Sequence, residues 1–536
     1  MPALSALFGA VRPSAVFIAL KRILPSSVRT CSRQADFPKN RAPPSLFFFS
    51  QEHKGCTSLS QTVGSSAEQA LHPEDSAEAL QLAGRLHEAA AAYQIRLAST
   101  PNDPRTLSNY GGLLNASSRF DDAYIVLTRS IALDPTQPDA WSNLGNTLLH
   151  LARYDDAIAA YRNCLQRNPA HALALSNLGL LLDHRGAHEL AQKFHQVAIQ
   201  LSPDNVHTRT NYAISLLAQG DYVAGFREYE WRWTTHSSRS YGMTVPQWKG
   251  EDFPGRTLMI HTEGGFGDMI QFSRFIPLAA QRGGHVIVRA RKELLTLLRQ
   301  SFPEQQFFSE DDVVPPHDLQ CPVLSLPFAL STTLTTIPGA GGFLHADAQK
   351  TSFWHQMFHQ DDAANGARPD PLRVGLVWAG APHPEIQAAE LADRRRSTDL
   401  ATFAPLARTD ANILFYSLQI GEKSWQARTP PTGMHLVDHT PLLHDFSDTA
   451  ALVNALDLVI AVDTSTAHVA AGLGKPVWML SRYDQCWRWL SGRTDSPWYD
   501  SLRIYQQAVP LDWSDPIRHI VADLQVLAAP HRRPPA

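Results

Sequence analysis

A single period runs through the first half of this chain. Prolines, glycines and alanines recur there at intervals of 34 residues, in three series: Pro101, Pro135, Pro169 and Pro203; Gly111, Gly145 and Gly179; Ala89, Ala123, Ala157 and Ala191. A series of larger residues keeps the same step: Tyr93, Leu127, Tyr161, His195 and Tyr229. Several residue classes that share one period predict an array of repeats in which each repeat packs on its neighbours.

Each repeat is expected to hold two antiparallel helices. Small residues lie where the helices approach closely, and large residues fill the neighbouring holes. Proline ends the second helix because it lacks an N–H group and clashes with the preceding turn. The pattern, best formed at residues 138–171, resembles the tetratricopeptide family. Full units are expected to begin near Pro104, Pro138 and Ala172, with a partial unit from Ala70 and a divergent one from Val206.

The last repeat departs from the pattern. Gly225 stands where alanine is expected, and the aromatic segment 226–233 follows it. We interpret this aromatic end as the joint to the next domain, because a solenoid end must be capped or docked. Two functions for the array remain open: a groove that binds an extended polypeptide, or a spacer or dimerisation element.

Composition excludes several classes of partner. The chain has 536 residues with an apolar fraction of 44%, and its 47 basic and 51 acidic residues leave a net charge of −4. Because these charges nearly cancel, the chain has no overall positive electrostatic field that would attract a nucleic acid or an anionic membrane. No apolar run reaches transmembrane length. The five cysteines include no C-x-x-C pair, which disfavours a disulfide framework and a zinc site.

The first 66 residues are expected to lie outside the fold, as a leader or disordered segment. The first acidic residue is Asp36, and basic residues and serines precede it. This composition also suits an organellar transit peptide. Upstream sequence translated from a wrongly chosen start is a further alternative.

Beyond Trp248 the sequence changes to the strand–loop–helix rhythm of α/β folds. Residues 256–261 predict a buried strand, residues 262–268 a glycine-rich turn, residues 269–282 a helix and residues 285–289 another strand. Such a turn lets the backbone approach a ligand at a helix N-terminus, which favours negative charge.

Three residues of this turn are candidate site residues. Gly265 and Gly267 would allow the close approach, and Asp268 would serve as a general base. A plain helix cap is the alternative role of Asp268.

A second α/β unit is predicted after a linker at residues 361–372. Residues 373–378 and 456–462 predict buried strands, and a helix follows the second of them. A carboxylate, two hydroxyl groups and a histidine lie at the start of this helix: Asp463, Thr464, Ser465 and His468. Helix N-termini at the carboxyl ends of parallel strands bind phosphates. Helix capping and a core histidine are the alternative roles.

The C-terminal half is similar to the heptosyltransferase-like glycosyltransferases of family 9, in the bacterial variant that carries a preceding tetratricopeptide array. The resemblance is carried by the sequences EGGFGDMIQFSRF (263–275), RVGLVWAG (373–380), RRRS (394–397), SLQ (417–419), DFSDTA (445–450), VDTSTAHVAAGLGKPVW (462–478), WRW (487–489) and SPWY (496–499).

This resemblance implies a GT-B fold, which consists of two Rossmann-like lobes. By position, Asp268 would deprotonate the acceptor hydroxyl. The nucleotide-sugar site would combine the two glycines and the helix-start residues named above with Gln419 and with Arg395 and Arg396, which the resemblance places in the loop after the strand 373–378. Transfer would need no metal and no cofactor, because helix N-termini and arginine would meet the diphosphate charge. The short first lobe and the long loop 382–391 depart from the family and put catalysis in doubt.

The predicted chain is therefore an α-helical solenoid followed by an α/β region. Its expected parts are a leader (1–66), the repeat array (67–236), a first lobe with linker (237–371) and a nucleotide-binding second lobe with tail (372–536). The resemblance implies a bacterial cytoplasmic glycosyltransferase, at most peripheral to the inner membrane, with a protein or peptide partner in the repeat groove. The alternatives are a non-catalytic scaffold and a protein O-glycosyltransferase of the N-acetylglucosamine-transferring kind.

Overall fold

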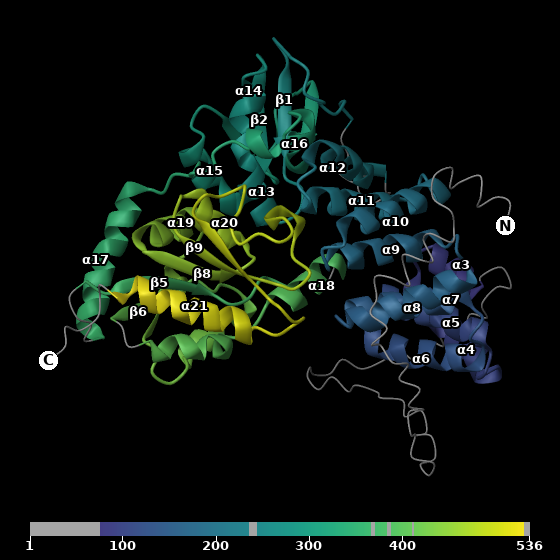
Figure 1. Ribbon diagram of the computed structural model, residues 1–536. Helices are drawn as coiled ribbons and strands as arrows, with labels where there is room; N and C mark the ends of the chain where they lie inside the picture. Colours follow the sequence, from purple (N-terminus) through teal and green to yellow (C-terminus); the bar gives the residue numbers. More distant parts are fainter. Residues whose placement is uncertain (1–75, 235–243, 366–369, 383–386, 410–411, 530–536) are drawn as a thin grey trace, which may run out of the picture. The chain divides into compact units, whose positions relative to one another are not determined.

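The computed structural model describes residues 76–234, 244–365, 370–382, 387–409 and 412–529 (Figure 1). These residues belong to the second of the two units into which the chain divides, residues 71–536. The predicted leader lies outside the described residues. Across the described ranges, no helix has the length and apolar character needed to cross a membrane.

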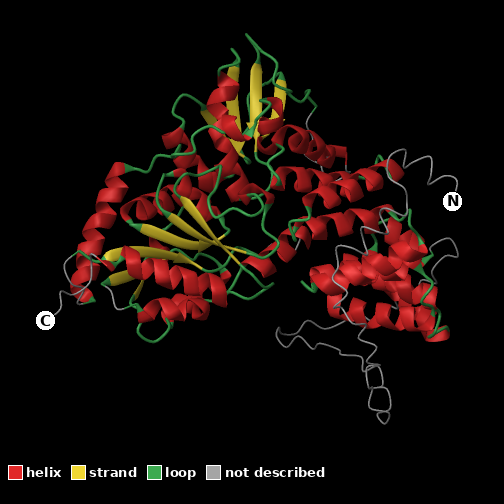
Figure 2. Ribbon diagram, in the orientation of Figure 1, coloured by secondary structure: helices red, strands yellow, loops and turns green. Residues whose placement is uncertain are grey.

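The first described part is an array of paired helices (Figure 2). The helices are α3 (Ala77–Leu82), α4 (Leu86–Ser99), α5 (Pro104–Ala116), α6 (Phe120–Leu133), α7 (Pro138–His150), α8 (Tyr154–Arg167), α9 (Ala172–Asp183), α10 (His188–Leu201), α11 (Val206–Ala218) and α12 (Tyr222–Tyr229). The helices α5, α7, α9 and α11 begin at the four positions from which the sequence predicts repeats. The predicted helical array is therefore confirmed.

The glycine series packs against the series of large residues, as the repeat pattern requires. A Cβ atom built on Gly145 would lie 2.4 Å from Cε1 of Tyr161, and one on Gly111 would lie 2.4 Å from Cγ of Leu127. Because real Cβ atoms do not approach so closely, only glycine fits beside these side chains.

The aromatic end of the array packs on the α/β region. Helix α12 leads into the 3₁₀ helix η1 (Glu230–Thr234). The Tyr222 ring lies 5.5 Å from Trp498, and the Phe226 ring lies 5.7 Å from Trp487, between ring centroids. This docking agrees with the interpretation of the aromatic segment as a joint.

The first sheet is parallel, with the strand order β3-β2-β1-β4. Its strands are β1 (Thr257–His261), β2 (His285–Ala290), β3 (Gln306–Ser309) and β4 (Leu319–Pro322). The helical segments around it are α13 (Phe266–Phe272), η3 (Ser273–Phe275), α14 (Ile276–Ala280), η4 (Lys292–Leu294), α15 (Leu295–Ser301), η5 (Val323–Ser325), α16 (Leu326–Ala329) and η6 (Leu334–Thr336). The single helix predicted at 269–282 instead begins at Phe266 and is interrupted by η3.

The second sheet has six parallel strands in the order β10-β9-β8-β5-β6-β7. They are β5 (Leu372–Val377), β6 (Ile413–Ser417), β7 (Leu436–Asp438), β8 (Leu458–Val462), β9 (Val477–Ser481) and β10 (Leu502–Gln506). The direction of the strand order reverses between β5 and β8. In open α/β sheets, ligands bind beyond the carboxyl ends of the strands at such a reversal.

Helices cover both faces of this second sheet (Figure 2). Val459 and Ala461 of β8 pack in one apolar cluster with α19 (Phe446–Ala455) and α20 (Ser465–Gly472). Alternate residues of β8 pack in another cluster with η7 (Leu400–Arg408) and α21 (Ser514–Leu527). The remaining helical segments are α17 (Ala348–Ala364), α18 (Gln387–Arg396), η8 (Glu422–Arg428), η9 (Thr440–Leu442) and η10 (Trp487–Trp489).

Two local predictions were wrong. The predicted linker at 361–372 begins inside α17, which continues to Ala364. The arginine run at 394–396, predicted to lie in a loop, forms the last turn of α18.

Candidate functional site

The glycine-rich turn after β1 holds the carboxylate of Asp268 at the start of α13. Oδ2 of Asp268 accepts a hydrogen bond of 2.8 Å from the backbone N–H of Gly265. Gly264 has a φ of +76°, and a Cβ atom there would lie 2.3 Å from the same oxygen. Gly265 is the residue that caps the helix, and Asp268 in the first turn accepts from its N–H, which is one of the two hydrogen bonds of a capping box.

The other carboxylate oxygen of Asp268 forms an ion pair with Arg488 of η10. Nε of Arg488 donates to Oε1 of Gln271 at 2.8 Å, and the guanidinium lies 4.5 Å from the Trp487 ring. Burial opposes the charge of Arg488, but the combined interactions with Asp268, Cys486 and Tyr229 outweigh burial and raise the arginine pKa. Arg488 therefore links η10 of the second α/β unit to α13, which follows the first strand of the first sheet. It was not among the predicted site residues, although it lies in the WRW sequence.

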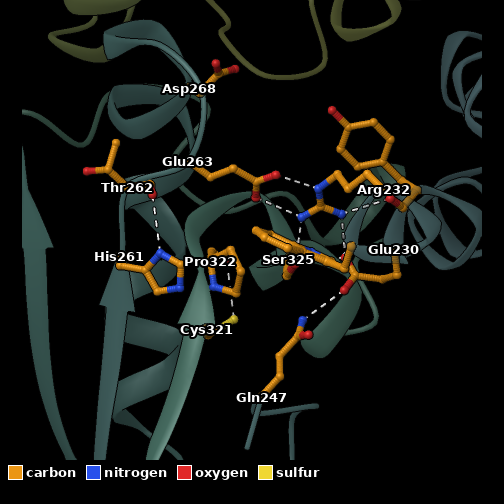
Figure 3. Close-up of polar contacts among 12 residues, drawn as sticks. Glu230, Arg232, Gln247, His261, Thr262, Glu263, Asp268, Cys321, Pro322 and Ser325 are labelled. Atoms are coloured by element: carbon orange, nitrogen blue, oxygen red, sulfur yellow. Dashed lines mark hydrogen bonds and ion pairs between the residues drawn. The ribbon is translucent and has the colours of Figure 1, made fainter. Parts of the chain in front are cut away.

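A second arginine braces the glycine turn from the array (Figure 3). Arg232 of η1 donates from Nε and Nη2 to the two carboxylate oxygens of Glu263, at 2.6 and 2.8 Å. The same guanidinium donates to Glu230 and to Ser325. Burial raises the pKa of Glu263, and the bonds from Arg232 oppose that rise. Figure 3 shows that Asp268 points away from this cluster.

At the second junction, Thr464 caps α20 with its hydroxyl buried. Its side chain makes no capping bond, and Oγ1 has no hydrogen-bond partner although the residue is only 7% exposed. Ser465 follows as the first helical residue. Oδ2 of Asp463 accepts a bond of 2.9 Å from the indole N–H of Trp489. The junction thus combines a helix N-terminus with an unsatisfied hydroxyl.

His468 is enclosed in the same region. Its Nδ1 lies 2.8 Å from the hydroxyl of Tyr499, and its ring stacks on Trp489 at 5.4 Å between centroids. Burial lowers the pKa of His468 to about 4, so the imidazole is neutral at pH 7. These contacts match the alternative role of a core histidine.

The two junctions meet directly. A Cβ atom on Gly267 would lie 2.9 Å from Cδ2 of His468 and 3.7 Å from Cα of Ser465. Only a glycine allows this approach of α13 to α20. The glycine turn and the hydroxyl-bearing helix start therefore lie in direct contact.

Arg396 reaches this meeting point from α18. Its Nη1 donates to the carbonyl of Asp463 at 3.0 Å, and its Nε donates to Asp393 at 3.1 Å. A Cβ atom on Gly380 would lie 2.6 Å from Nη2 of Arg396. Arg396 thus lies between the ends of β5 and β8, where the strand order reverses.

Two predicted site residues are engaged elsewhere. Nη1 of Arg395 lies 2.8 Å from Oδ2 of Asp484. The positive charge of Arg395 also opposes the rise in the pKa of Tyr154 that burial causes. The buried amide of Gln419 accepts from the backbone N–H groups of Trp378 and Ala379, and it donates to two carbonyls. These contacts account for both residues without a ligand.

Two cavities have no predicted site residue in their lining. One lies between η7 and α21, and the other lies between α9, α11 and the loop after β9. Among the described residues, no group of three or more His, Cys, Asp or Glu is placed to hold a metal ion.

Comparisons with known proteins identify the repeat. Residues 138–171 match the tetratricopeptide repeat model. The chain is 25% identical over 344 residues to protein FlbA of Caulobacter vibrioides, which covers 59% of this chain and 54% of that protein. The chain thus spans about half the length of this relative.

Three solved structures are each similar to 31% of this chain. MamA is 22% identical with a TM-score of 0.25, covering 31% of this chain and 98% of that chain. A thermophilic TPR protein of Thermus thermophilus is 18% identical with a TM-score of 0.29, covering 31% and 90%. YrrB, described as a TPR protein with an unusual peptide-binding site, is 14% identical with a TM-score of 0.24, covering 31% and 87%. The chain therefore contains a tetratricopeptide repeat, and a helical array of this kind precedes its α/β region.

Proposed function

We propose that the α/β region is a GT-B glycosyltransferase, in which the two parallel sheets are two Rossmann-like lobes. It would move a sugar from a nucleoside-diphosphate sugar to a glycan or protein acceptor, while the array recruits the acceptor or a partner. The observation that carries the proposal is the contact between the glycine turn of α13 and the start of α20. That contact brings a carboxylate and an anion-binding helix end to one place.

The start of α20 suits the diphosphate of the donor. Its first backbone N–H groups have no partner within the helix and favour negative charge. The unpartnered hydroxyl of Thr464 lies there, with Ser465 beside it and Arg396 at the Asp463 carbonyl. Hydroxyl, amide and guanidinium donors would together stabilise the leaving diphosphate, and we expect no metal in the reaction.

Asp268 is the proposed general base. The Gly265 N–H contacts one oxygen of its carboxylate and Arg488 contacts the other. Because both oxygens are engaged, proton transfer from the acceptor hydroxyl requires that Arg488 release Oδ1 when substrates bind.

The substitution Asp268→Asn tests this assignment. We expect it to abolish detectable transfer, because general-base help contributes about 10²–10⁴-fold in rate. Nucleotide affinity should remain nearly unchanged, since Asp268 does not contact the donor phosphates in this mechanism. The matched control is Asp252→Asn in the same lobe, where the carboxylate is 75% exposed.

Sugar transfer and nucleotide affinity are measured separately. A thermal-shift screen over UDP, GDP, ADP and CMP identifies the nucleobase of the donor, because a ligand that binds only the folded state raises Tm. If Asp268→Asn turns over as fast as the unmodified chain, Asp268 is not the general base. An absence of stabilisation by every nucleotide would remove the donor site.

A non-catalytic scaffold is the second candidate function. Several contacts favour it: both oxygens of Asp268 are engaged, Gln419 is fully hydrogen-bonded and Arg395 pairs with Asp484. Under this proposal the array binds a protein or peptide and the α/β region is structural. The nucleotide screen distinguishes the two functions.

The acceptor class is a separate question. A protein O-glycosyltransferase would use the array to hold a polypeptide acceptor, and incorporation of labelled sugar into protein rather than glycolipid would identify it. The proposed donor and the absence of a membrane-spanning helix among the described residues are compatible with a cytoplasmic enzyme.

A further inference from the structure

One position of the repeat contacts the α/β region in two of the repeats. In four successive helix pairs, the second helix begins with Phe120, Tyr154, His188 or Tyr222, at steps of 34 residues. Tyr222 packs on Trp498 at the end of the array. Tyr154 stacks on Tyr483 of the loop after β9, with 5.4 Å between ring centroids and 19° between ring planes. The array therefore contacts the α/β region at its end and also through a repeat in its middle.

The loop after β9 also carries a buried carboxylate. Asp484 follows Tyr483 and is only 5% exposed. Its Oδ2 lies 2.8 Å from Nη1 of Arg395, and its Oδ1 lies 3.6 Å from Nε of Arg482. Burial opposes the charge of Asp484, but the combined interactions with Arg482, Arg395 and His184 outweigh burial and lower the aspartate pKa. This ion pair holds the end of α18, because Arg395 lies in the last turn of that helix.

Two rings of the array lie near the same arginine. Burial and Asp484 raise the pKa of Tyr154 to about 12, whereas the charge of Arg395 and a hydrogen bond to it oppose the rise. Burial lowers the pKa of His150, at the end of α7, to about 4, and the charge of Arg395 acts in the same direction. Both rings are therefore uncharged at pH 7, and both belong to the repeat at residues 138–171.

The next residue of α18 reaches the proposed donor site. Arg396 donates from Nη1 to the Asp463 carbonyl at 3.0 Å. Oδ1 of Asp393 accepts from Nε of Arg396 at 3.1 Å and from the hydroxyl of Ser397 at 2.9 Å. Arg395 and Arg396 are consecutive residues of one helical turn. A displacement of Arg395 therefore moves the backbone that carries Arg396.

We infer that Tyr154 is a positioning residue for the proposed donor site, because it holds α18 where Arg396 reaches the diphosphate. The inference rests on the proposed function, since it concerns the same arginine. A long arginine side chain loses conformational freedom when it binds a ligand, and a helix that is already fixed reduces this loss. The array thereby influences donor affinity without contacting the nucleotide.

Nucleotide affinity of the full chain tests the inference. Isothermal titration calorimetry with UDP, GDP, ADP and CMP measures Kd for the unmodified chain and for each variant. We expect Tyr154→Leu to weaken the nucleotide that binds most tightly by about twofold to thirtyfold, the range for residues that act through others. Tyr483→Leu removes the same ring stack without altering the array core, and it should weaken binding by a similar factor. Tyr154→Phe keeps the stacked ring and should lose less affinity than Tyr154→Leu.

Tyr161→Leu is the matched control. Tyr161 lies on the same helix, and its ring packs on Gly145 inside the array, so its loss should lower Tm and leave Kd unchanged. In an Arg396→Gln background, Tyr154→Leu should cause no further loss of affinity. Unchanged affinity in Tyr154→Leu and Tyr483→Leu, or an equal loss with and without Arg396, overturns the inference and leaves the donor site standing. If no nucleotide binds the unmodified chain, the proposed donor site is refuted and the inference falls with it.

Discussion

Thr464 and Thr147 are both buried threonines, and they differ in what their hydroxyls contact. Oγ1 of Thr147 bonds to Oδ1 of Asn115 at 2.8 Å and to the Asn143 carbonyl at 2.9 Å. Oγ1 of Thr464 has no partner. A hydroxyl retained in the core without a bond contributes nothing to folding, so its role is better sought in ligand binding.

Valine substitution separates these two roles. Thr147→Val should lower the free energy of unfolding by about 1–2 kcal/mol, because it removes the buried hydroxyl that donates to Asn115. Thr464→Val should leave that free energy equal or slightly higher, yet it should reduce the thermal shift produced by the bound nucleotide. Urea unfolding and the nucleotide screen measure the two effects. Equal destabilisation by both substitutions would mean that the Thr464 hydroxyl is structural.

At the level of the helix pair, the contact between Gly145 of α7 and Tyr161 of α8 leaves no room for a larger residue. Gly145→Ala should lower the free energy of unfolding by about 1–3 kcal/mol, because the added methyl overpacks the interface. The loss should shrink in a Tyr161→Leu background, where the ring is absent. A double-mutant cycle by urea unfolding measures this coupling. Additive effects of the two substitutions on the free energy of unfolding would show that Gly145 and Tyr161 are not energetically coupled.

The elements differ in how far the sequence could predict them. The repeat helices could be predicted because each one repeats a local pattern of Gly, Ala and Pro. The arginine run of α18 was missed although Ala, Leu, Glu and Arg favour helices, because the family resemblance placed it in a loop. The pair of Asp268 and Arg488 was also beyond prediction, because 220 residues separate the partners. Local turns were thus visible in the sequence, whereas contacts that assemble the site depend on tertiary packing.

Across the whole molecule, the end of the array is part of the α/β core rather than an appendage. Tyr222 and Phe226 are almost fully buried against Trp487 and Trp498. Arg232 is the ion-pair partner of the buried Glu263. An α/β fragment without this segment would expose an aromatic surface and leave Glu263 unpaired.

Two truncations test this dependence. A fragment of residues 244–536 should aggregate and bind the dye ANS, because the surface around Trp487 and Trp498 becomes exposed. A fragment of residues 205–536 keeps α11, α12 and η1, so it should remain mostly monomeric with weaker dye binding. Size-exclusion chromatography and ANS fluorescence compare the two at equal concentration. Similar behaviour of both fragments would mean that the α/β region folds independently of the array end, and the array would then be free to move relative to the proposed site.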